Sequence, residues 1–179
     1  MIPLPNKKYK IIYSDPAWYF KSYSKKGEKR NATKHYPCME FNDLLDLNIN
    51  SIADMDCVLF IWVVDPLLHK SFEVIKKWGF TYKTCAFSWI KKNKKSDSLF
   101  WGLGYWTRAN NEICLLATKG KPQRVSKAVH QVVYEPIREH SRKPDCVRDR
   151  IVELCGDLSR IELFARQKVE GWDCWGNEV

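Results

Sequence analysis

The chain has 179 residues, of which 45% are hydrophobic and 28% charged, and these values exclude wholesale disorder. The length fits one domain, so we expect residues 1–179 to form a single domain with a real hydrophobic core. Lysine and arginine outnumber the acidic residues by 30 to 21, which gives a net charge of +9. This charge favours a polyanionic partner and leaves nucleic acid, a membrane surface and a ribosome-sized anion equally open.

The first elements follow a short polar lead-in. The apolar run over residues 9–13 predicts a buried strand, which Pro16 ends abruptly. A basic loop without periodicity follows over residues 21–34. A short helix is then expected over residues 42–47.

The middle of the chain predicts a strand, a helix and a second strand. Residues 57–64 are all apolar, which is typical of a parallel-sheet strand buried on both faces. Asp65-Pro66 suits the start of a helix, and Gly79 suits its end. Residues 80–90 predict another strand, and the lysine-rich residues 91–95 predict a second basic loop.

The last third continues the alternation. Strands are predicted over residues 113–117, 131–134 (an edge strand) and 161–164, and a helix over residues 144–155. Residues 119–130 are predicted to be a basic surface segment. The alternation of strands and helices predicts an α/β domain with a mostly parallel sheet.

Cysteine usage and hydropathy bear on the cellular compartment. The seven cysteines form no Cys-x-x-Cys pair, their number is odd, and no signal peptide precedes them. We therefore expect reduced thiols in a cytoplasmic protein. The four histidines are scattered, so no metal site is expected. The longest apolar run is too short to span a bilayer, so no membrane partner is expected.

The tetrapeptide Asp15-Pro16-Ala17-Trp18 follows the first predicted strand, at the end where open α/β sheets bind ligands. The Asp15 carboxylate and the Pro16 carbonyl could accept two N–H bonds from an exocyclic amino group, while Trp18 stacks on the base. A plain Asp-Pro turn beside a core tryptophan fits the tetrapeptide equally well. The tetrapeptide alone leaves both interpretations open.

Six motifs occur in a fixed order. They are Asp15-Pro16-Ala17-Trp18, Tyr36 with Met39, Gly104-Tyr105-Trp106-Thr107-Arg108, His140-Ser141-Arg142-Lys143-Pro144, Glu162-Leu163-Phe164-Ala165-Arg166, and Gly171-Trp172 with Trp175-Gly176-Asn177-Glu178. Over residues 9–179 the chain resembles the adenine-N6 methyltransferase family that contains the eukaryotic messenger-RNA adenosine methyltransferase and its bacterial and phage relatives. It departs from the eukaryotic enzymes at Ala17, where they have a second proline, and in lacking an upstream strand that helps hold the cofactor adenine.

The resemblance implies a Rossmann-like S-adenosylmethionine-dependent methyltransferase in permuted order, with the catalytic motif first and the cofactor motifs last. It implies that Asp15, Pro16, Ala17 and Trp18 form the catalytic motif. By the same resemblance, Lys143 pairs with the methionine carboxylate of the cofactor. The other implied cofactor residues are Arg166, Asn177 and Glu178 at the ribose, Gln167 beside them, and Glu162 and Phe164 on the methionine side.

The expected reaction is methyl transfer to the N6 amine of adenine in a flipped-out or single-stranded nucleotide, without a covalent intermediate. The basic loops would neutralise phosphates. Residues expected to contact the nucleic acid are Tyr19, Tyr36, Trp106, Arg108 and Arg142. DNA is favoured over RNA because the chain lacks the zinc-finger and partner-recruiting extensions of the eukaryotic enzyme. A homodimer or a second subunit is possible on this reasoning.

Several alternatives stay open at this point. The same reaction on RNA is one alternative, and methylation of the cytosine exocyclic amine, which the Asp-Pro-x-aromatic motif also serves, is another. A third is a catalytically inactive nucleic-acid-binding subunit, although such family members typically lose the Asp or the aromatic residue, and this chain has both Asp15 and Trp18. Pro37-Cys38 is similar to the nucleophile motif of carbon-5 cytosine methyltransferases, but their Glu-Asn-Val signature is missing. Product analysis separates these activities.

Overall fold

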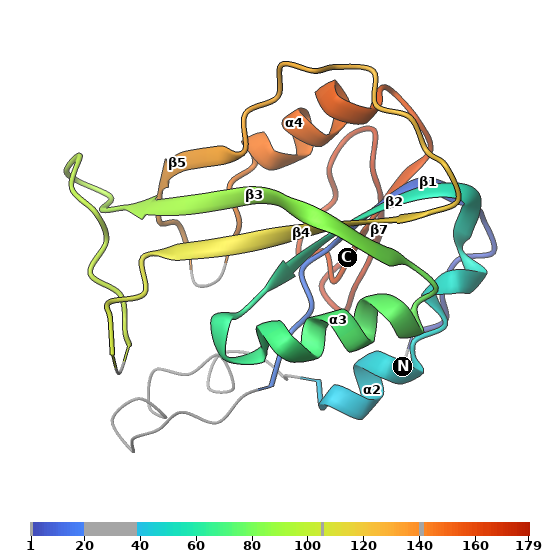
Figure 1. The fold of residues 1–179 in the computed structure, drawn as a ribbon, viewed down its shortest axis with the longest axis horizontal. Helices are drawn as coiled ribbons and strands as arrows, with labels where there is room; N and C mark the ends of the chain where they lie inside the picture. Colours follow the sequence, from blue (N-terminus) through green and yellow to red (C-terminus); the bar gives the residue numbers. More distant parts are fainter. Residues whose placement is uncertain (1, 20–38, 105, 140–141) are drawn as a thin grey trace.

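The computed structural model describes residues 2–19, 39–104, 106–139 and 142–179. At its centre is a seven-stranded sheet with the strand order β5-β3-β4-β2-β1-β6-β7 (Figure 1). The strands are β1 (Tyr9–Ser14), β2 (Ala53–Val63), β3 (Thr81–Lys92), β4 (Asn111–Lys119), β5 (Val132–Pro136), β6 (Arg160–Leu163) and β7 (Asp173–Trp175). The helices are α2 (Phe41–Asp46), α3 (Leu68–Lys77) and α4 (Cys146–Cys155), with 3₁₀ turns η2 (Ile49–Ser51) and η3 (Asp65–Leu67).

The sheet is mostly parallel, as the alternation of elements predicted. Strand β1 runs parallel to both β2 and β6, and the pairs β3–β5 and β6–β7 are also parallel. Strand β4 alone runs antiparallel to its neighbours β2 and β3. It does so because β3 and β4 are joined as a hairpin without a crossover helix. The fold is a Rossmann-like α/β fold with one reversed strand.

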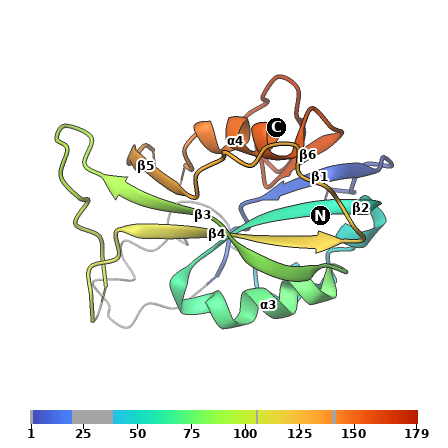
Figure 2. The same cartoon turned by 45° about the horizontal axis from the view of Figure 1, so that its top comes forward.

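Helices cover both faces of the sheet (Figure 2). Successive residues of β1 point to opposite faces, because side chains alternate along a strand. Ile12 packs into the hydrophobic cluster that contains Leu44 of α2 and Val74 of α3. Ile11 packs into the other cluster, which contains Val147 of α4. The two-sided burial of the central strands explains their nearly continuous apolar sequences.

Some element boundaries differ from the predictions. The prediction of a basic loop over residues 91–95 was wrong at its start, since Lys91 and Lys92 lie in β3. The helix expected to start at Asp65-Pro66 begins as the 3₁₀ turn η3 and becomes α-helical at Leu68. Strand β7 was not predicted, because three residues are too few to show a periodicity. The predicted basic loop over residues 21–34 lies outside the described residues.

The topology brings several loop positions to one edge of the sheet. Because β1, β2 and β6 are parallel, their carboxyl ends meet there, followed by Asp15, Asp65 and Phe164. The reversed strand β4 starts at this edge, so Glu112 joins them. We call it the carboxyl edge, and ligands of open α/β sheets bind at such edges. Within the described part of the chain, no helix has both the length and the apolar character needed to cross a bilayer.

Candidate active site

A lysine links two carboxylates at the carboxyl edge. The Nζ of Lys143 lies 2.9 Å from Oδ2 of Asp15 and 3.1 Å from Oε2 of Glu112. The other oxygen of Glu112 lies 2.5 Å from Nζ of Lys91. The Lys143 side chain is only 10% exposed, so these ion pairs are shielded from water and salt. The side chains of Lys91, Glu112, Lys143 and Asp15 thus form a compact, mostly buried series in which positive and negative charges alternate.

Burial and charge act differently on the two acids. Burial raises the pKa of Asp15 above its ordinary value, and Lys143 only partly opposes this effect. Burial also acts to raise the pKa of Glu112, but Lys143 and Lys91 together outweigh it, so the net pKa is lowered. Among the described residues, two lysines, Lys91 and Lys143, lie within hydrogen-bonding distance of Glu112, whereas Lys143 alone lies so close to Asp15. Despite its burial, Lys143 has a raised pKa because Asp15 and Glu112 flank its ammonium group.

A second buried ion pair lies beside the first group. Arg148 of α4 donates from Nε and Nη2 to both oxygens of Glu162, at 2.7 and 2.8 Å. Its Nη1 donates to Asp145 at 3.0 Å, and its guanidinium lies 5.9 Å from the ring centroid of Tyr13. Glu162 is only 6% exposed, so its charge needs this two-point partner.

A pocket of about 260 Å³ joins these groups at the carboxyl edge. It is lined by Tyr13, Asp15, Glu139, Arg142, Lys143, Arg148, Glu162, Phe164, Arg166, Gln167 and Glu178. Six of the seven residues predicted to bind the cofactor line it together with Asp15, and Asn177 does not. Arg142, predicted to contact nucleic acid, also lines this pocket and pairs with Glu139 and Asp145. Its role in substrate binding stays a prediction.

The carboxyl-terminal segment closes one side of the pocket. After β6, Phe164 has the left-handed φ of 61°, which is uncommon for a residue with a side chain and turns the chain sharply. Its ring packs against Trp175 at a centroid distance of 5.4 Å. A Cβ on Gly176 would lie 2.4 Å from the carbonyl oxygen of Ala165, so only glycine fits this contact. The segment thereby brings Oε1 of Glu178 to 4.0 Å from Nε of Arg166.

The Asp-Pro-Ala-Trp turn is anchored in the core. The Nε1 of Trp18 donates to the Trp62 carbonyl at 2.9 Å, and Nε1 of Trp62 donates to the Tyr13 hydroxyl at 2.7 Å. Trp18 is 4% exposed, and its backbone N–H donates to the Pro16 carbonyl at 2.8 Å. Stacking of the Trp18 ring on a base therefore stays a prediction, as do the two N–H bonds at Asp15 and Pro16.

The residues predicted to contact nucleic acid are spread apart. Tyr19 follows the turn and is partly exposed, while Tyr36 lies outside the described residues. Trp106 and Arg108 lie in the long connection between β3 and β4, and Trp106 is 92% exposed. Lys91 is paired with Glu112 and Lys92 with Asp97, so these two lysines of the predicted basic loop already have acidic partners.

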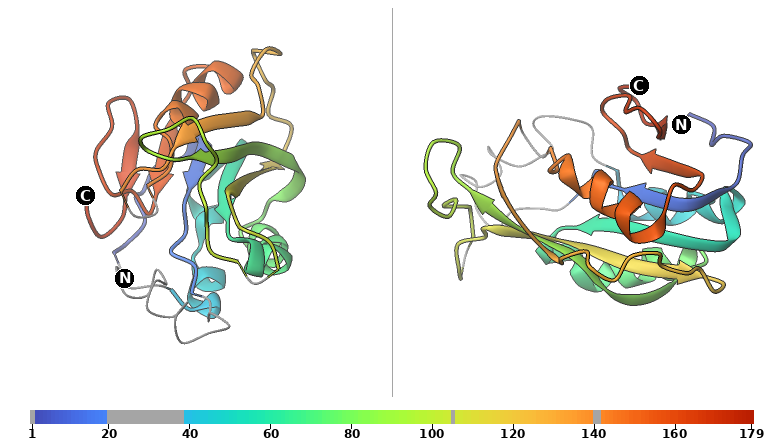
Figure 3. Two further views of the ribbon diagram at one scale, coloured as in Figure 1. Left: turned by 90° about the vertical axis from the view of Figure 1, so that its left-hand side faces the viewer. Right: turned by 90° about the horizontal axis from the view of Figure 1, so that it is seen from above.

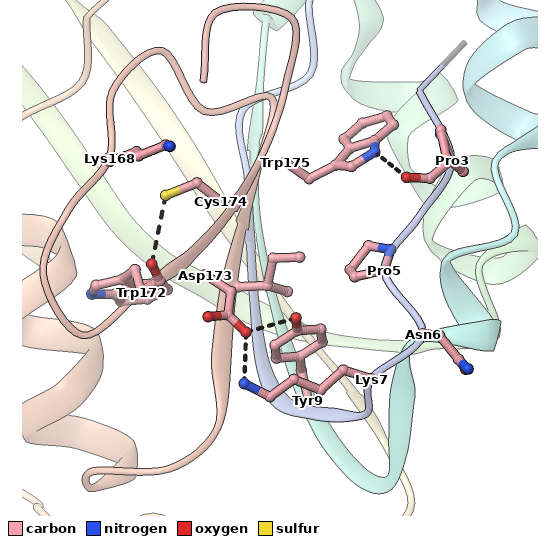
Figure 4. Close-up of a pocket in the computed structure, with 11 residues that line it drawn as sticks. Pro3, Pro5, Asn6, Lys7, Tyr9, Lys168, Trp172, Asp173, Cys174 and Trp175 are labelled. Carbon is pink, nitrogen blue, oxygen red and sulfur yellow. Dashed lines mark hydrogen bonds and ion pairs between the residues drawn. The ribbon is translucent and has the colours of Figure 1, made fainter.

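A second pocket, of about 640 Å³, lies between the amino-terminal segment and β7 (Figure 4). Its acidic group, Asp173, accepts hydrogen bonds from Tyr9 at 2.8 Å and from Lys7 at 2.7 Å. Trp175 donates from Nε1 to the Pro3 carbonyl at 3.2 Å and so ties the two walls together. No residue predicted to act in catalysis or binding lines this pocket.

Comparison with known proteins gives the family. The family model described as MT-A70 matches residues 9–178, nearly the whole chain. The chain belongs to the MT-A70 family. Members of this family are methyltransferases that use S-adenosylmethionine, in agreement with the resemblance seen in the six motifs.

Individual MT-A70 relatives differ in length and in similarity. The chain is 37% identical over 193 residues to the Type II methyltransferase M.MunI of Mycoplasma sp, covering 98% of this chain and 80% of that protein. It is 27% identical over 176 residues to the N(6)-adenosine-methyltransferase catalytic subunit METTL3 of Homo sapiens, covering 96% of this chain and 28% of that protein. An MT-A70-like N(6)-adenosine-methyltransferase of Arabidopsis thaliana is 26% identical over 172 residues, covering 94% and 23%. The chain thus spans about a quarter of the length of these two eukaryotic relatives.

The residues of this pocket fit the cofactor of MT-A70 enzymes. S-adenosylmethionine carries a carboxylate, a sulfonium and a ribose diol, and it carries no phosphate. The pocket offers a cation for the carboxylate at Lys143, and polar partners for the diol at Arg166 and Glu178, with the Gln167 amide beside them. The donor set therefore matches the charged and polar groups of this cofactor.

Four residues of the site were not predicted from the sequence: Tyr13, Glu139 and Arg148, which line the pocket, and Glu112, which binds Lys143. Glu112 reaches Lys143 only because β4 is reversed, and nothing in its sequence shows strand direction. Arg148 lies five residues after Lys143 and pairs with a residue fourteen positions further on. A signal for Arg148 existed, since the predicted helix carries an arginine close to the face that buries Val147 and Ile151. The six motifs do not include it.

Proposed function

We propose that this protein transfers the methyl group of S-adenosylmethionine to the N6 amine of adenine in DNA. The observation that carries the proposal is the shared pocket, in which Asp15 of the Asp-Pro-Ala-Trp motif stands beside six residues expected to bind the cofactor. The protein is an enzyme of the MT-A70 family. In this proposal residues 1–179 form its one catalytic domain. The free thiols of the six described cysteines fit a cytoplasmic enzyme.

In this proposal the chain holds both reactants by charge. S-adenosylmethionine, when bound, supplies an electrophilic methyl group on a sulfonium. Lys143 would hold its carboxylate, and Arg166, Asn177 and Glu178 its ribose with Gln167 beside them, while Glu162 and Phe164 line the methionine side. Burial raises the pKa of Glu162, and Arg148 opposes this rise while it fixes the carboxyl group by two hydrogen bonds.

Asp15 is the residue that would position the target amine. Its carboxylate and the Pro16 carbonyl accept the N–H bonds of the amine, so that the nitrogen lone pair faces the methyl donor. Lys143 holds Oδ2 of Asp15 at 2.9 Å, which fixes the direction of the carboxylate. The amine nitrogen is itself the nucleophile, so no side chain has to form a covalent bond to the base. Catalysis is then positioning plus electrostatic stabilisation.

DNA is the proposed substrate because the higher identity is to the Type II methyltransferase of Mycoplasma sp, at 37% against 27% for human METTL3. The net charge of +9 favours a polyanion. Exposed residues that would contact the strand are Tyr19, Trp106 and Arg108. The N(6)-adenosine-methyltransferase names among the relatives support the same reaction on RNA as the second candidate.

The proposal is tested by product analysis. Single- and double-stranded DNA and RNA oligonucleotides are incubated with the protein and isotope-labelled S-adenosylmethionine, and their nucleosides are separated by mass spectrometry. We expect label in N6-methyldeoxyadenosine, and about 100- to 1,000-fold slower labelling with Asp15→Asn. Label only in N6-methyladenosine would move the substrate to RNA, and label in N4-methyldeoxycytidine would move the target base. Cofactor binding by calorimetry without transfer to any nucleic acid would indicate an inactive subunit.

A further inference from the structure

The connection between β3 and β4 forms a narrow arm beyond the end of the sheet. We call residues 99–110 the aromatic arm, of which residue 105 is not among the described residues. The arm extends past the helical layers, as Figure 1 and the right-hand view of Figure 3 show. A tight turn over residues 93–98 precedes it, in which the Asn93 N–H donates to the Ser98 carbonyl at 3.0 Å.

One backbone hydrogen bond crosses the aromatic arm, and another ties its start to β3. The N–H of Ala109 donates to the Leu103 carbonyl at 3.3 Å, and the N–H of Phe100 donates to the Lys91 carbonyl at 2.8 Å. A Cβ on Gly102 would lie 1.6 Å from the Ala109 carbonyl oxygen, a distance that no side chain permits. Glycine at this position therefore sets the shape of the arm.

This shape presents an aromatic ring and a cation together. The guanidinium of Arg108 lies 5.5 Å from the ring centroid of Trp101, a cation–π contact. Trp101 nevertheless keeps 75% of its surface exposed. Leu103 and Trp106 on the same arm are also exposed, and such a cluster of exposed apolar side chains points to a ligand with a flat apolar face.

The charge around the arm indicates what that ligand is. Lys94 and Lys95 lie in the adjoining turn, and Arg108 lies on the arm itself. The acidic residue of the turn, Asp97, is paired with Lys92. Lysine is depleted in protein–protein interfaces, whereas single-stranded nucleic acid binds to aromatic side chains set among cations.

The arm rises directly from the carboxyl edge. The N–H of Lys91 donates to the carbonyl of Asn110 at the arm's base, at 2.8 Å, and Lys91 also binds Glu112. Glu112 binds Lys143, which binds Asp15. Three successive ion pairs therefore connect the base of the arm to Asp15.

From these observations we infer that Trp101 and Arg108 form a stacking platform for an unpaired base that flanks the target base. The inference rests on the proposed function and adds a binding site for the substrate strand. Trp101 supplies the ring face, Arg108 fixes the ring and offers charge to the phosphate, and the glycine-shaped arm keeps both in place.

Binding is tested with fluorescent single-stranded DNA that contains one adenine and an abasic site moved along the strand. Trp101→Ala is expected to weaken binding of the intact strand by about 5- to 150-fold, the range for removal of one base–aromatic stack. Trp101→Phe should keep most of the affinity. At one abasic position, the wild-type protein should bind the abasic strand as weakly as Trp101→Ala binds the intact strand. Trp101→Ala should bind this abasic strand and the intact strand with equal affinity.

Tyr82→Ala is the matched control, because Tyr82 is also an exposed aromatic residue of the β3–β4 hairpin but lies near the opposite end of β3. It should bind the strand like the wild type. Equal affinity of Trp101→Ala and wild type, or a loss that does not depend on the abasic position, would overturn the inference. A further contrary result would be a wild-type dimer in sedimentation runs that becomes a monomer in Trp101→Ala while strand binding is unchanged. The arm would then bind a second copy of the protein. If the wild type methylates DNA in any of these cases, the proposed function stands.

Discussion

The ammonium group of Lys143 lies 2.9 Å from the carboxylate of Asp15, although 128 residues separate them in the chain. The contact joins the first of the six motifs to the fourth. It also places a positive charge between Asp15 and Glu112, so the negative charges of these two partly buried carboxylates are compensated. The catalytic motif is therefore held by charge compensation as well as by the turn itself.

Asp15→Asn should lower the turnover of DNA methylation by about 100- to 1,000-fold, the effect of losing one preorganised polar partner. The side-chain shape is kept, so the fold and cofactor binding should change little. Initial rates and calorimetric titration with S-adenosylmethionine measure the two quantities. Turnover close to that of the wild type would remove Asp15 from the mechanism.

The pH–rate profile should report the environment of Asp15. Burial raises the pKa of Asp15, with Lys143 opposing and Glu112 adding to the rise, so the acid limb should lie above the ordinary value of 3.8. The ionised form accepts the amine, and activity is lost as the pH falls through this raised pKa. Glu112→Gln removes a like charge, so the limb should move to lower pH. Methylation rates on a short single-stranded oligonucleotide at a series of pH values measure the acid limb. A limb that moves to higher pH in Glu112→Gln would contradict the effect of Glu112 on Asp15.

Arg148→Met should destabilise the protein by about 3–5 kcal/mol, because it leaves the buried carboxylate of Glu162 without a partner. The double variant Arg148→Met/Glu162→Met should recover much of this loss, since neither charge then remains buried. Urea unfolding measures both changes. Lys7→Met removes an exposed ion pair with Asp173 and should cost no more than about 1 kcal/mol. Equal losses in Arg148→Met and Lys7→Met would show that the burial of Glu162 carries no energetic weight.

Gly176→Ala should reduce the free energy of S-adenosylmethionine binding more than it reduces the free energy of unfolding. Its new methyl group would meet the backbone of Ala165, which has no side-chain freedom to give way. The carboxyl-terminal segment must then shift and take Glu178 away from Arg166. Calorimetry should show a raised dissociation constant for the cofactor. Val179→Ala, at the end of the same segment, is the control and should bind like the wild type.

DNA affinity should fall steeply with salt, because cations release counterions from the phosphates. The double variant Lys94→Gln/Lys95→Gln should reduce the slope of log K against log salt by about 1 for each phosphate that no longer binds a lysine. Lys76→Gln/Lys77→Gln, at the end of α3, should leave the slope unchanged. A slope that is equal in all three proteins would exclude the turn before the aromatic arm from phosphate binding.

The sequence by itself determined the strands and helices that have strong patterns, such as the apolar core of β2, and the presence of all six motifs. It did so because hydrophobic periodicity and turn chemistry depend on neighbouring residues, and each motif is a short segment whose order along the chain is visible in the sequence. The tertiary structure alone decided that β4 is reversed, that Glu112 and Arg148 belong to the site, and that Lys91 pairs with Glu112. These features depend on strand direction and on distances across the sheet. Neither is encoded by residues that are close together in the chain.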